Sequence, residues 1–467
     1  MRRLLLVFVL VLPLAIAPSP IQAQDPQVPA ILPMEERAEV VNRWLQIRFD
    51  TVIPMLMRRA DVDMWVVSAR EYNEDPIIET MLPATWQSAR RRTILVFYDR
   101  GPEEGVERLA IARYDIGEFF ASAWDKEEQP DQWARLAEVI EARDPQQIAV
   151  NRSETFGLAD GMTDTEFDGM QAALPSTYQD RIVSGEDLAI GWLETRTPEE
   201  MAVYPMIVRM AHAIIAEGFS EAVIQPGVTT TADVQWWYRD RIRNLNLTAW
   251  FHPSVSVQRP EAGEGGDFSS RPEASVIQPG DLLHVDFGIT YLRLNTDTQQ
   301  HAYILKPGET EAPAGLRDGL ATGNRLQDIL TNQFEAGRSG NEILSAALNQ
   351  AEAEGIDASI YTHPIGFHGH GAGPTIGLWD QQGGVPGKGD YPLYANTAYS
   401  IELNAAVSVP EWDGQEILIK LEEDAFFDGE TVAYIDGRQK ALHLIPRQHG
   451  QPYAPLLPIT NEPASGY

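Results

Sequence analysis

The chain has 467 residues, a formal net charge of −32 and no cysteine. Such an acidic charge repels phosphate backbones, and no basic stripe offsets it, so we expect no nucleic-acid partner. The lack of cysteine excludes disulfides and thiolate zinc sites, and the length predicts two domains.

The first 23 residues predict a secretory signal. Arg2 and Arg3 precede an apolar stretch over residues 4–17, and a Pro-Ser-Pro segment comes before Ala23. The stretch is shorter than the roughly 20 residues that span a bilayer, and there is no cysteine to carry a lipid. We therefore expect cleavage after Ala23 and a mature bacterial protein that is periplasmic or secreted, without a membrane anchor.

Residues 24–185 are predicted to form a smaller α/β domain. An amphipathic helix at residues 34–59 is followed by alternating strands and helices, which is typical of this class. Strands are expected at 64–67, 93–98, 108–114 and 147–150, and helices at 131–142 and 164–173. No cluster of acids and histidines falls here, so we expect this domain to shape a cleft or to form a homodimer.

Residues 186–445 are predicted to form an α+β domain in which helices flank an antiparallel sheet. Thr197 and Pro198 are typical of a helix start, and this helix is expected to continue to about residue 223. Further elements are expected in the order helix 231–243, strand 248–257, a glycine- and acid-rich loop 261–270, helices 314–335 and 340–354, and a proline-rich tail 446–467.

Asp286 and Asp297 lie eleven residues apart. Asp286 follows the apolar run 282–285, and a second apolar run at 302–305 comes after Asp297. If these runs pair as an antiparallel hairpin centred near residues 291–292, the aspartates face each other with Cβ atoms about 4.5–5.5 Å apart. Two apposed buried carboxylates resist ionising together, so the pattern predicts that they clamp cations.

More potential ligands follow on later strand-like segments, namely His363, His368, His370, Glu402, Glu422 and Glu423. One imidazole with four carboxylates is an oxygen-rich ligand set. Such a set favours Mn²⁺, with Zn²⁺, Co²⁺ or Fe²⁺ as alternatives.

The segments DFG with the second aspartate, GHGAG, SIE and KLEED occur in this order. In these motifs the chain resembles the pita-bread metallopeptidases, which include aminopeptidase P, prolidase, methionine aminopeptidase and creatinase. The resemblance covers about residues 190–440, and the preceding region resembles the N-terminal domain of the aminopeptidase P–prolidase branch. It implies a curved antiparallel sheet, two divalent cations, bridging roles for Asp297 and Glu422, and the metal ligands Asp286, Asp297, His370, Glu402 and Glu422.

The choice between Glu422 and Glu423 depends on this resemblance. In one strand over residues 417–427, alternation would turn Glu423 toward the apolar face and Glu422 toward the face of Lys420. The family order of basic, apolar, glutamate and two acidic residues selects Glu422, because a metal site makes its own face polar.

His370 is selected as the ligand because it lies in the GHG context. His363 and His368 then become candidates for proton transfer and substrate contact, and His252 is a further candidate for substrate contact. In the family a second histidine follows the ligand by seven residues, but here the residue seven positions after His370 is Gly377.

Two further departures concern the surroundings of the metal ligands. The family histidine before the first aspartate is not evident in residues 263–276, and the usual threonine-rich stretch after the second aspartate reads TQQH at 298–301. Metal-dependent hydrolysis is therefore a firmer expectation than selectivity for proline.

We expect an exported dinuclear-metal peptidase that hydrolyses peptide bonds near the N-terminus, above all Xaa-Pro bonds. A hydroxide that bridges the two cations would attack the carbonyl, and Glu402 would transfer a proton to the leaving amine. Two alternatives remain open: a metal-independent amidinohydrolase like creatinase, and a non-catalytic protein that binds metal or peptide.

Overall fold

The computed structural model describes residues 28–260 and 274–447. The predicted signal, the loop at 261–270 and most of the proline-rich tail lie outside the described residues. Within the described residues, no helix combines the length and the apolar character needed to cross a membrane.

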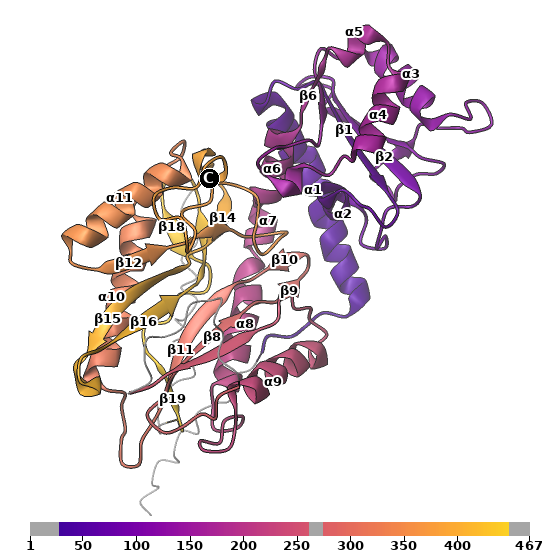
Figure 1. The fold of residues 1–467 in the computed structure, drawn as a ribbon. Coiled ribbons are helices and arrows are strands. Elements are labelled where there is room, and N and C mark those ends of the chain that lie inside the picture. Colours follow the sequence, from indigo (N-terminus) through magenta and orange to yellow (C-terminus); the bar gives the residue numbers. More distant parts are fainter. Residues whose placement is uncertain (1–27, 261–273, 448–467) are drawn as a thin grey trace, which may run out of the picture.

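The N-terminal part is built on a six-stranded sheet with the order β4-β3-β2-β1-β5-β6 (Figure 1). The predicted strands are confirmed, although β3 ends three residues early. The strands are β1 (Met64–Arg70), β2 (Arg92–Asp99), β3 (Val106–Ile111), β4 (Ala121–Ser122), β5 (Ile148–Val150) and β6 (Ile182–Ser184). The helices are α1 (Met34–Arg59), α2 (Pro76–Met81), α3 (Gln132–Arg143), α4 (Asp164–Ala173), α5 (Ser176–Gln179) and α6 (Glu186–Glu194).

Helix α1 connects this sheet to the rest of the molecule. Phe49 in the middle of α1 stacks on Trp192 of α6, with ring centroids 5.5 Å apart. One residue earlier, the Arg48 guanidinium donates to Glu200 of α7 (Pro198–Met201) at 3.1 Å, and both side chains are fully buried. A buried charge that lost its partner would be strongly destabilising, so this ion pair fixes α1 against the start of the C-terminal part.

The single helix predicted from Thr197 to about residue 223 is wrong, because the chain forms two helices. After α7, a new helix α8 runs over Tyr204–Gly218. Pro205 lies in the first turn of α8, where its missing N–H and its clash with the preceding turn prevent one continuous helix. The second predicted helix is confirmed as α9 (Thr231–Asn244).

The C-terminal part contains two sets of strands, each covered by helices. Helices α8 and α9 pack on the sheet β19-β11-β8-β7, which consists of β7 (Ser254–Gln258), β8 (Leu282–Phe287), β11 (Thr298–Ile304) and β19 (His443–Ile445). Helices α10 (Ala314–Thr331) and α11 (Gly340–Ala353) pack on the sheet β12-β15-β16, formed by Asp357–Ile360, Leu403–Val409 and Gln415–Leu421. A further sheet β13-β14-β17-β18 consists of His363–Pro364, Thr397–Ser400, Asp424–Phe427 and Val432–Tyr434.

The register of the aspartate hairpin differs from the prediction. Asp286 on β8 pairs with Gln299 on β11, and not with Asp297. The cause is the inner hairpin of β9 (Thr290–Tyr291) and β10 (Leu294–Asn295), whose two-residue turn is Leu292-Arg293. A turn centred one residue later than predicted moves every cross-strand partner by two residues, and this leaves Asp297 diagonal to Asp286 on the same face.

One backbone contact joins the two sets of strands. Gln299 of β11 forms an isolated antiparallel bridge with Glu422, with N–H to O distances of 2.9 and 3.3 Å in the two directions. The predicted single strand over residues 417–427 breaks at Glu422 and Glu423, where the chain passes from β16 to β17. This junction brings the aspartate hairpin and the segment with Glu422 to one place in the fold.

Candidate metal centre

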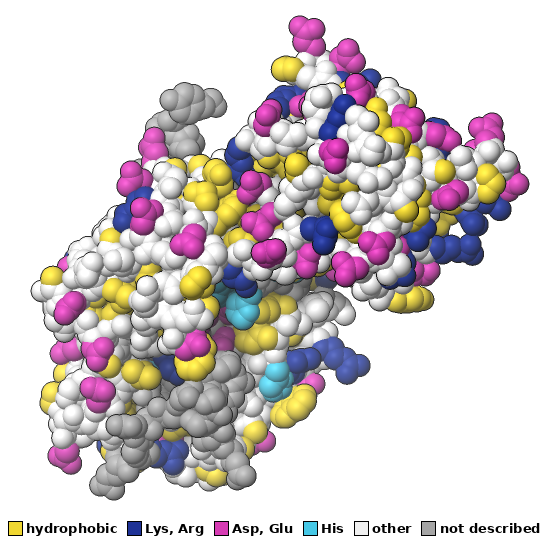
Figure 2. All heavy atoms as spheres, turned by 45° about the horizontal axis from the view of Figure 1, so that its top comes forward, with side chains coloured by type: hydrophobic (Ala, Val, Ile, Leu, Met, Phe, Trp, Pro, Cys, Tyr) yellow, Lys and Arg dark blue, Asp and Glu magenta, His cyan; other side chains and the backbone are white. Residues whose placement is uncertain are grey.

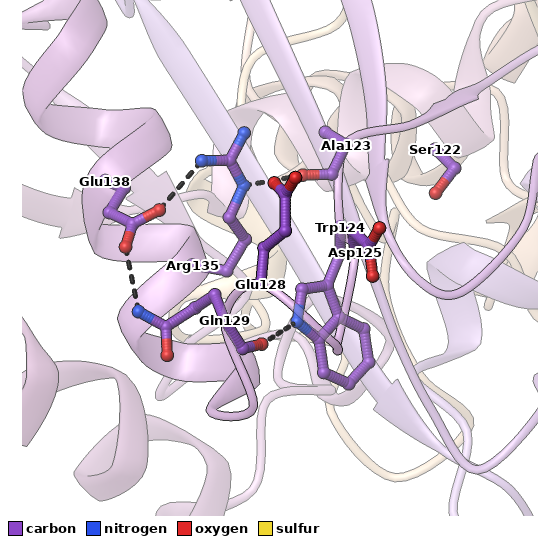
Figure 3. A pocket seen from close by; sticks show the side chains of 8 residues that line it. All are labelled: Ser122, Ala123, Trp124, Asp125, Glu128, Gln129, Arg135 and Glu138. Atoms are coloured by element: carbon purple, nitrogen blue, oxygen red, sulfur yellow. Dashed lines mark hydrogen bonds and ion pairs between the residues drawn. The ribbon is translucent and has the colours of Figure 1, made fainter.

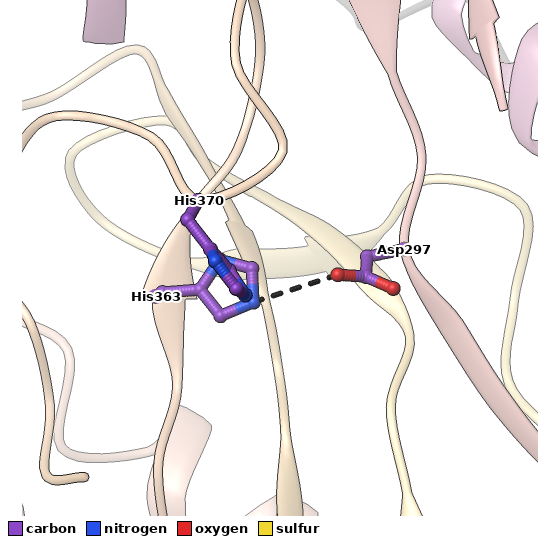
Figure 4. Close-up of side chains that lie close together, drawn as sticks. All are labelled: Asp297, His363 and His370. Carbon is purple, nitrogen blue, oxygen red and sulfur yellow. Dashed lines mark ion pairs between the residues drawn. The ribbon is translucent and has the colours of Figure 1, made fainter. Parts of the chain in front are cut away.

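Six potential ligand side chains converge where the strand sets meet. They form three overlapping groups whose ligand atoms lie within 4.8 Å of one another, made from Asp286, Asp297, His363, His370, Glu402 and Glu422. Figure 4 shows His363 and His370 pointing toward Asp297 from the neighbouring backbone. Asp286, Asp297, His363, Glu402 and Glu422 lie at or near strand ends, and His370 lies in the loop that follows β13.

His363 lies among the carboxylates. Its Nε2 is 3.3 Å from Glu422 Oε1, 3.7 Å from Asp297 Oδ2 and 3.9 Å from Glu402 Oε2. Its Nδ1 lies 3.0 Å from the carbonyl oxygen of Pro364, which holds the ring with Nε2 toward the acids. A backbone acceptor on one ring nitrogen is the usual support for a histidine whose other nitrogen binds a metal.

His370, the ligand selected from the sequence, lies at the edge of the centre. Its ring is 4.7 Å from the ring of His363 and 5.3 Å from that of Trp250. Partial burial, with a smaller contribution from His363, lowers the pKa of His370 to about 4. His370 is the seventh residue after His363, which is the spacing expected from the resemblance between a histidine ligand and the second histidine.

The carboxylates of the centre are buried close to one another, and their negative charges repel. Burial, and then the charges of Glu422, Asp286 and Glu402, raise the pKa of Asp297 well above its usual value. Burial, and then the charges of Glu422 and Asp286, raise the pKa of Glu402 well above its usual value. Asp297 Oδ1 and His363 Nε2 are buried and have no hydrogen-bond partner among the described residues. Unsatisfied buried acceptors beside repelling carboxylates fit a site for divalent cations.

Gln299 is a functional candidate that sequence reasoning missed. Its amide nitrogen donates to Glu402 Oε1 at 2.5 Å and to Glu422 Oε2 at 2.7 Å. His284 Nε2 lies 2.7 Å from Gln299 Oε1, and burial lowers the pKa of His284 well below its usual value. A neutral His284 protonated at Nε2 therefore donates to the amide oxygen and turns the NH₂ group toward the two acids. The signal in the sequence was the glutamine at a position where the family has threonine.

Glu422 and Glu423 lie between the end of β16 and the start of β17, and their side chains point in different directions. Glu422 accepts from the Ser400 hydroxyl at 2.7 Å and faces the metal centre. Glu423 lies outside the three ligand groups and is 2.7 Å from His212 Nε2 on α8. The structure thus brings Glu422, the residue selected from the sequence, into the centre. The single strand from which the two faces were predicted is not formed at this position.

His368 and His252, the other residues predicted to contact substrate, lie in different places. His368 lines a cavity of about 530 Å³ beside the centre, and His370 lines the same cavity. His252 lies 3.4 Å from Arg239 and 5.0 Å from the Trp236 ring, and it is neither in the ligand groups nor among the lining residues. Figure 2 shows histidine side chains at the surface near the junction of the two parts of the molecule.

The histidine loop is held against Trp250. The indole nitrogen of Trp250 donates to the Thr296 carbonyl at 2.9 Å. A Cβ added at Gly369 would lie 2.3 Å from Trp250 Cζ2, so the loop backbone rests directly on the ring. This contact sets the path of the chain from His368 to His370.

A second depression of about 450 Å³ lies in the N-terminal part, around Trp124 and Arg135 (Figure 3). Its polar groups bond to one another: Arg135 donates to Glu138 at 2.8 Å, and Trp124 donates to the Gln129 carbonyl at 2.7 Å. Because these groups are already satisfied, this depression offers no reactive cluster.

The comparisons with known proteins agree with this geometry. Residues 207–426 match the model of metallopeptidase family M24. The matched segment resembles an M24 metallopeptidase domain. It contains all six clustered ligand candidates, and no curated protein matches the chain by sequence.

Solved structures resemble the whole molecule and not the matched segment alone. An X-Pro aminopeptidase from Thermotoga maritima has a TM-score of 0.58 at 16% identity, and covers 84% of this chain and 99% of its own. An Xaa-Pro dipeptidase from Bacillus anthracis has a TM-score of 0.51 at 17% identity, with coverages of 88% and 100%. The N-terminal domain of the FACT complex subunit SPT16 from chickpea has a TM-score of 0.52 at 11% identity, with coverages of 88% and 97%. The expected pita-bread fold with an N-terminal domain is therefore confirmed.

Proposed function

We propose that this chain is an exported, metal-dependent peptidase that removes the N-terminal residue from peptides of the Xaa-Pro type. The observation that carries the proposal is the convergence of two histidines and four carboxylates around orphaned buried ligand atoms, inside the segment that matches metallopeptidase family M24. The aminopeptidase and dipeptidase named among the similar structures support the choice of bond.

Two divalent cations fit the three ligand groups. Asp286, Asp297 and Glu422 would hold one, while His363, Glu402 and Glu422 would hold the other. Asp297, His363 and Glu422 each belong to two of the three groups, so each of these residues could contribute to more than one cation site. The oxygen-rich donors favour Mn²⁺. When bound, the cations supply Lewis acidity and a nucleophile that is available at neutral pH.

The protein's own groups position substrate and move the proton. Glu402 Oε1 is occupied by the Gln299 amide, so Oε2 is the oxygen left to accept a proton from the nucleophile and deliver it to the leaving amine. His370 remains neutral near pH 7 because its pKa lies at about 4. It can therefore donate or accept one hydrogen bond at the scissile carbonyl or the leaving nitrogen, and this is a contact role in place of the ligand role predicted from the sequence.

The second candidate function is a non-catalytic protein that binds metal or peptide. The Gln299 amide favours it, because its two hydrogen bonds already engage Glu402 and Glu422. The likeness to a FACT complex subunit also shows that this fold is not confined to proteins named as peptidases. The creatinase-like alternative is less favoured, because the complete set of acidic ligand candidates is present.

The test is hydrolysis of Xaa-Pro peptides by the full chain after addition of Mn²⁺, Zn²⁺ or Co²⁺, with products read by mass spectrometry. We expect Asp297→Ala to abolish hydrolysis and to lower the bound metal measured by elemental analysis. The matched control is Asp318→Asn, which changes an exposed aspartate on α10. Metal binding without any cleavage would favour the non-catalytic alternative, and cleavage without metal would contradict both.

Cell fractionation tests the location of the protein, and native mass measurement tests its oligomeric state. We propose a periplasmic or secreted protein and a homodimer formed through the N-terminal part. Recovery of the protein in the cytoplasm with residues 1–23 intact would contradict export.

A further inference from the structure

Phe367 lies in the histidine loop, and it lines the cavity beside the metal centre together with His368 and His370. Two guanidinium groups lie over its ring. The Cζ atoms of Arg48 and Arg196 are 4.7 and 4.6 Å from the ring centroid. A cation within about 6 Å of a ring centroid is attracted by the π electrons of the ring. Phe367 is therefore the point at which the histidine loop contacts two cations.

The two cations come from different places in the chain and share one carboxylate. Arg48 belongs to α1, whereas Arg196 lies between α6 and α7, and their exposed fractions are 0% and 2%. Arg48 donates to Glu200 at 3.1 Å, and Arg196 Nη1 lies 3.5 Å from Glu200 Oε2. One carboxylate cannot neutralise two guanidinium groups, and a buried charge without compensation is costly. The ring of Phe367 therefore compensates positive charge that Glu200 leaves.

Arg196 is fixed at its backbone and at its side chain. Its N–H donates to the Asn396 carbonyl at 2.7 Å, directly before β14. Its guanidinium donates to the Leu193 carbonyl in the last turn of α6. A Cβ added at Gly366 would lie 3.0 Å from Arg196 Cζ, so the backbone directly before Phe367 also rests on this guanidinium. Arg196 is thus a fixed support for the start of the histidine loop.

The chain beyond the histidine loop contacts the end of the same helix. A Cβ added at Gly373 would lie 2.8 Å from Oε2 of Glu194, which is the last residue of α6. The short segment from Glu194 to Arg196 therefore contacts the chain both before His370, at Gly366, and after it, at Gly373. Because both ends of the loop rest on this segment, its position affects the path of the loop between them.

We propose that Arg196, together with Arg48, is a positioning residue for His370. The two guanidinium groups hold the Phe367 ring, and this ring fixes the chain three residues before the imidazole. The proposal deepens the proposed function and rests on it, because it gives α1 and the N-terminal part a share in placing His370. A displacement of about 1 Å at a reacting centre can cost 10²-fold in rate, so contacts that act through Phe367 alone still affect turnover.

The experiment measures kcat, KM and bound metal for hydrolysis of an Ala-Pro peptide by the full chain with added Mn²⁺. Arg196→Met removes the cation and leaves Arg48 paired with Glu200, so no buried carboxylate loses its last partner. We expect kcat to fall at least about tenfold at unchanged metal content, and Arg196→Lys to recover part of this loss. The matched control is Arg92→Met, which likewise takes a guanidinium from a ring, that of Trp133 at 4.8 Å, and from a buried carboxylate. We expect its kinetics to equal those of the wild type.

A double-mutant cycle separates positioning through the ring from a general effect on stability. Phe367→Leu removes the π face and should itself lower kcat. In that background Arg196→Met should cause no further fall, because residues that act through one contact are not additive. If Arg196→Met lowers kcat by the same factor in the wild-type and Phe367→Leu backgrounds, the proposal is overturned, since Arg196 would then act without the ring.

Hydrogen exchange of the metal-free full chain keeps this test separate from the proposed function. The Gly366 N–H donates to the His368 carbonyl at 3.1 Å, and the Gly371 N–H donates to the Pro364 carbonyl at 2.7 Å, so these two amides report opening of the loop. We expect Arg196→Met to speed their exchange at least about tenfold relative to the rest of the chain.

An unchanged exchange rate, or an increase spread evenly over the chain, would overturn the proposal, because Arg196 would then be merely structural. A lack of hydrolysis with every metal would contradict the proposed function alone, and the exchange of the loop amides would then decide whether Arg196 positions the loop.

Discussion

The amide nitrogen of Gln299 lies 2.7 Å from Glu422 Oε2, and through it the aspartate hairpin contacts the glutamate strand. Asp286 on β8 is the direct cross-strand partner of Gln299 on β11. Gln299 therefore connects these two strands to the segment between β16 and β17 that carries Glu422. The amide compensates part of the negative charge of the carboxylates and also fixes which of their oxygens remain for a metal.

Gln299→Leu is expected to weaken metal binding. The change removes two donors to Glu402 and Glu422 while it keeps a similar side-chain volume, and loss of a group that orients metal ligands costs about 10–100-fold in affinity or activity. Calorimetric titration with Mn²⁺ measures the affinity. Gln333→Leu, which removes an amide that bonds Gln350 in another part of the molecule, is the control. Tighter Mn²⁺ binding by Gln299→Leu would show that the amide competes with the metal.

The two histidines at the centre should separate in their effects. His363→Ala is expected to lower bound metal and activity together, because His363 Nε2 faces three carboxylates within 3.9 Å. His370→Ala should lower kcat by about 10²–10⁴-fold, the usual contribution of a proton-transfer or hydrogen-bonding group, while metal content stays near that of the wild type. Elemental analysis with steady-state kinetics distinguishes them. Equal metal loss in both variants would make His370 a ligand after all.

Gly369→Ala tests the support of the histidine loop. The new methyl group would lie 2.3 Å from Trp250 Cζ2, so either the ring or the loop must move. A displacement of about 1 Å can cost 10²-fold in rate, and we expect at least a tenfold fall in kcat/KM with only a small change in melting temperature. Gly383→Ala is a matched control, because a Cβ there meets no atom within 4 Å. Unchanged kinetics for Gly369→Ala would show that the loop tolerates displacement.

The stability of the fold should decline in alkaline solution because of His212. Burial by itself lowers the pKa of His212, but the carboxylates of Glu423 and Asp436 outweigh this effect and raise it to about 10. The folded state therefore binds a proton that the unfolded chain releases near pH 6.5. This contribution is complete below about pH 6.5 and is lost as the pH rises toward about 10, at up to about 1.4 kcal/mol per pH unit.

Urea unfolding at several pH values measures this dependence. We expect His212→Gln to lower the free energy of unfolding at pH 6 and to flatten its change between pH 6.5 and 10. A variant curve parallel to that of the wild type would mean that His212 is neutral in the folded protein.

Local pattern was enough to predict most helices and strands. Residues 34–59 are a helix with the predicted bounds, and its buried residues recur at helical spacing from Val41 to Met57, although Pro54 lies inside it. Pro205 was the local signal that should have ended the helix after Thr197. The choice of Glu422 also came from sequence, through the order of residue types in a family motif, and the structure brings that residue to the other ligand candidates.

Residue order alone determined that the acids and histidines follow one another on strand-like segments of one α+β domain, since such segments depend on neighbours along the chain. Only the tertiary structure decided that Asp286 faces Gln299, that His363 lies among the carboxylates, and that Arg293 meets the N-terminal part at Thr80. Each of these follows from turn geometry or from contacts between residues far apart in sequence. A one-residue shift in a turn, invisible in a hydrophobic pattern, changes every partner across a pair of strands.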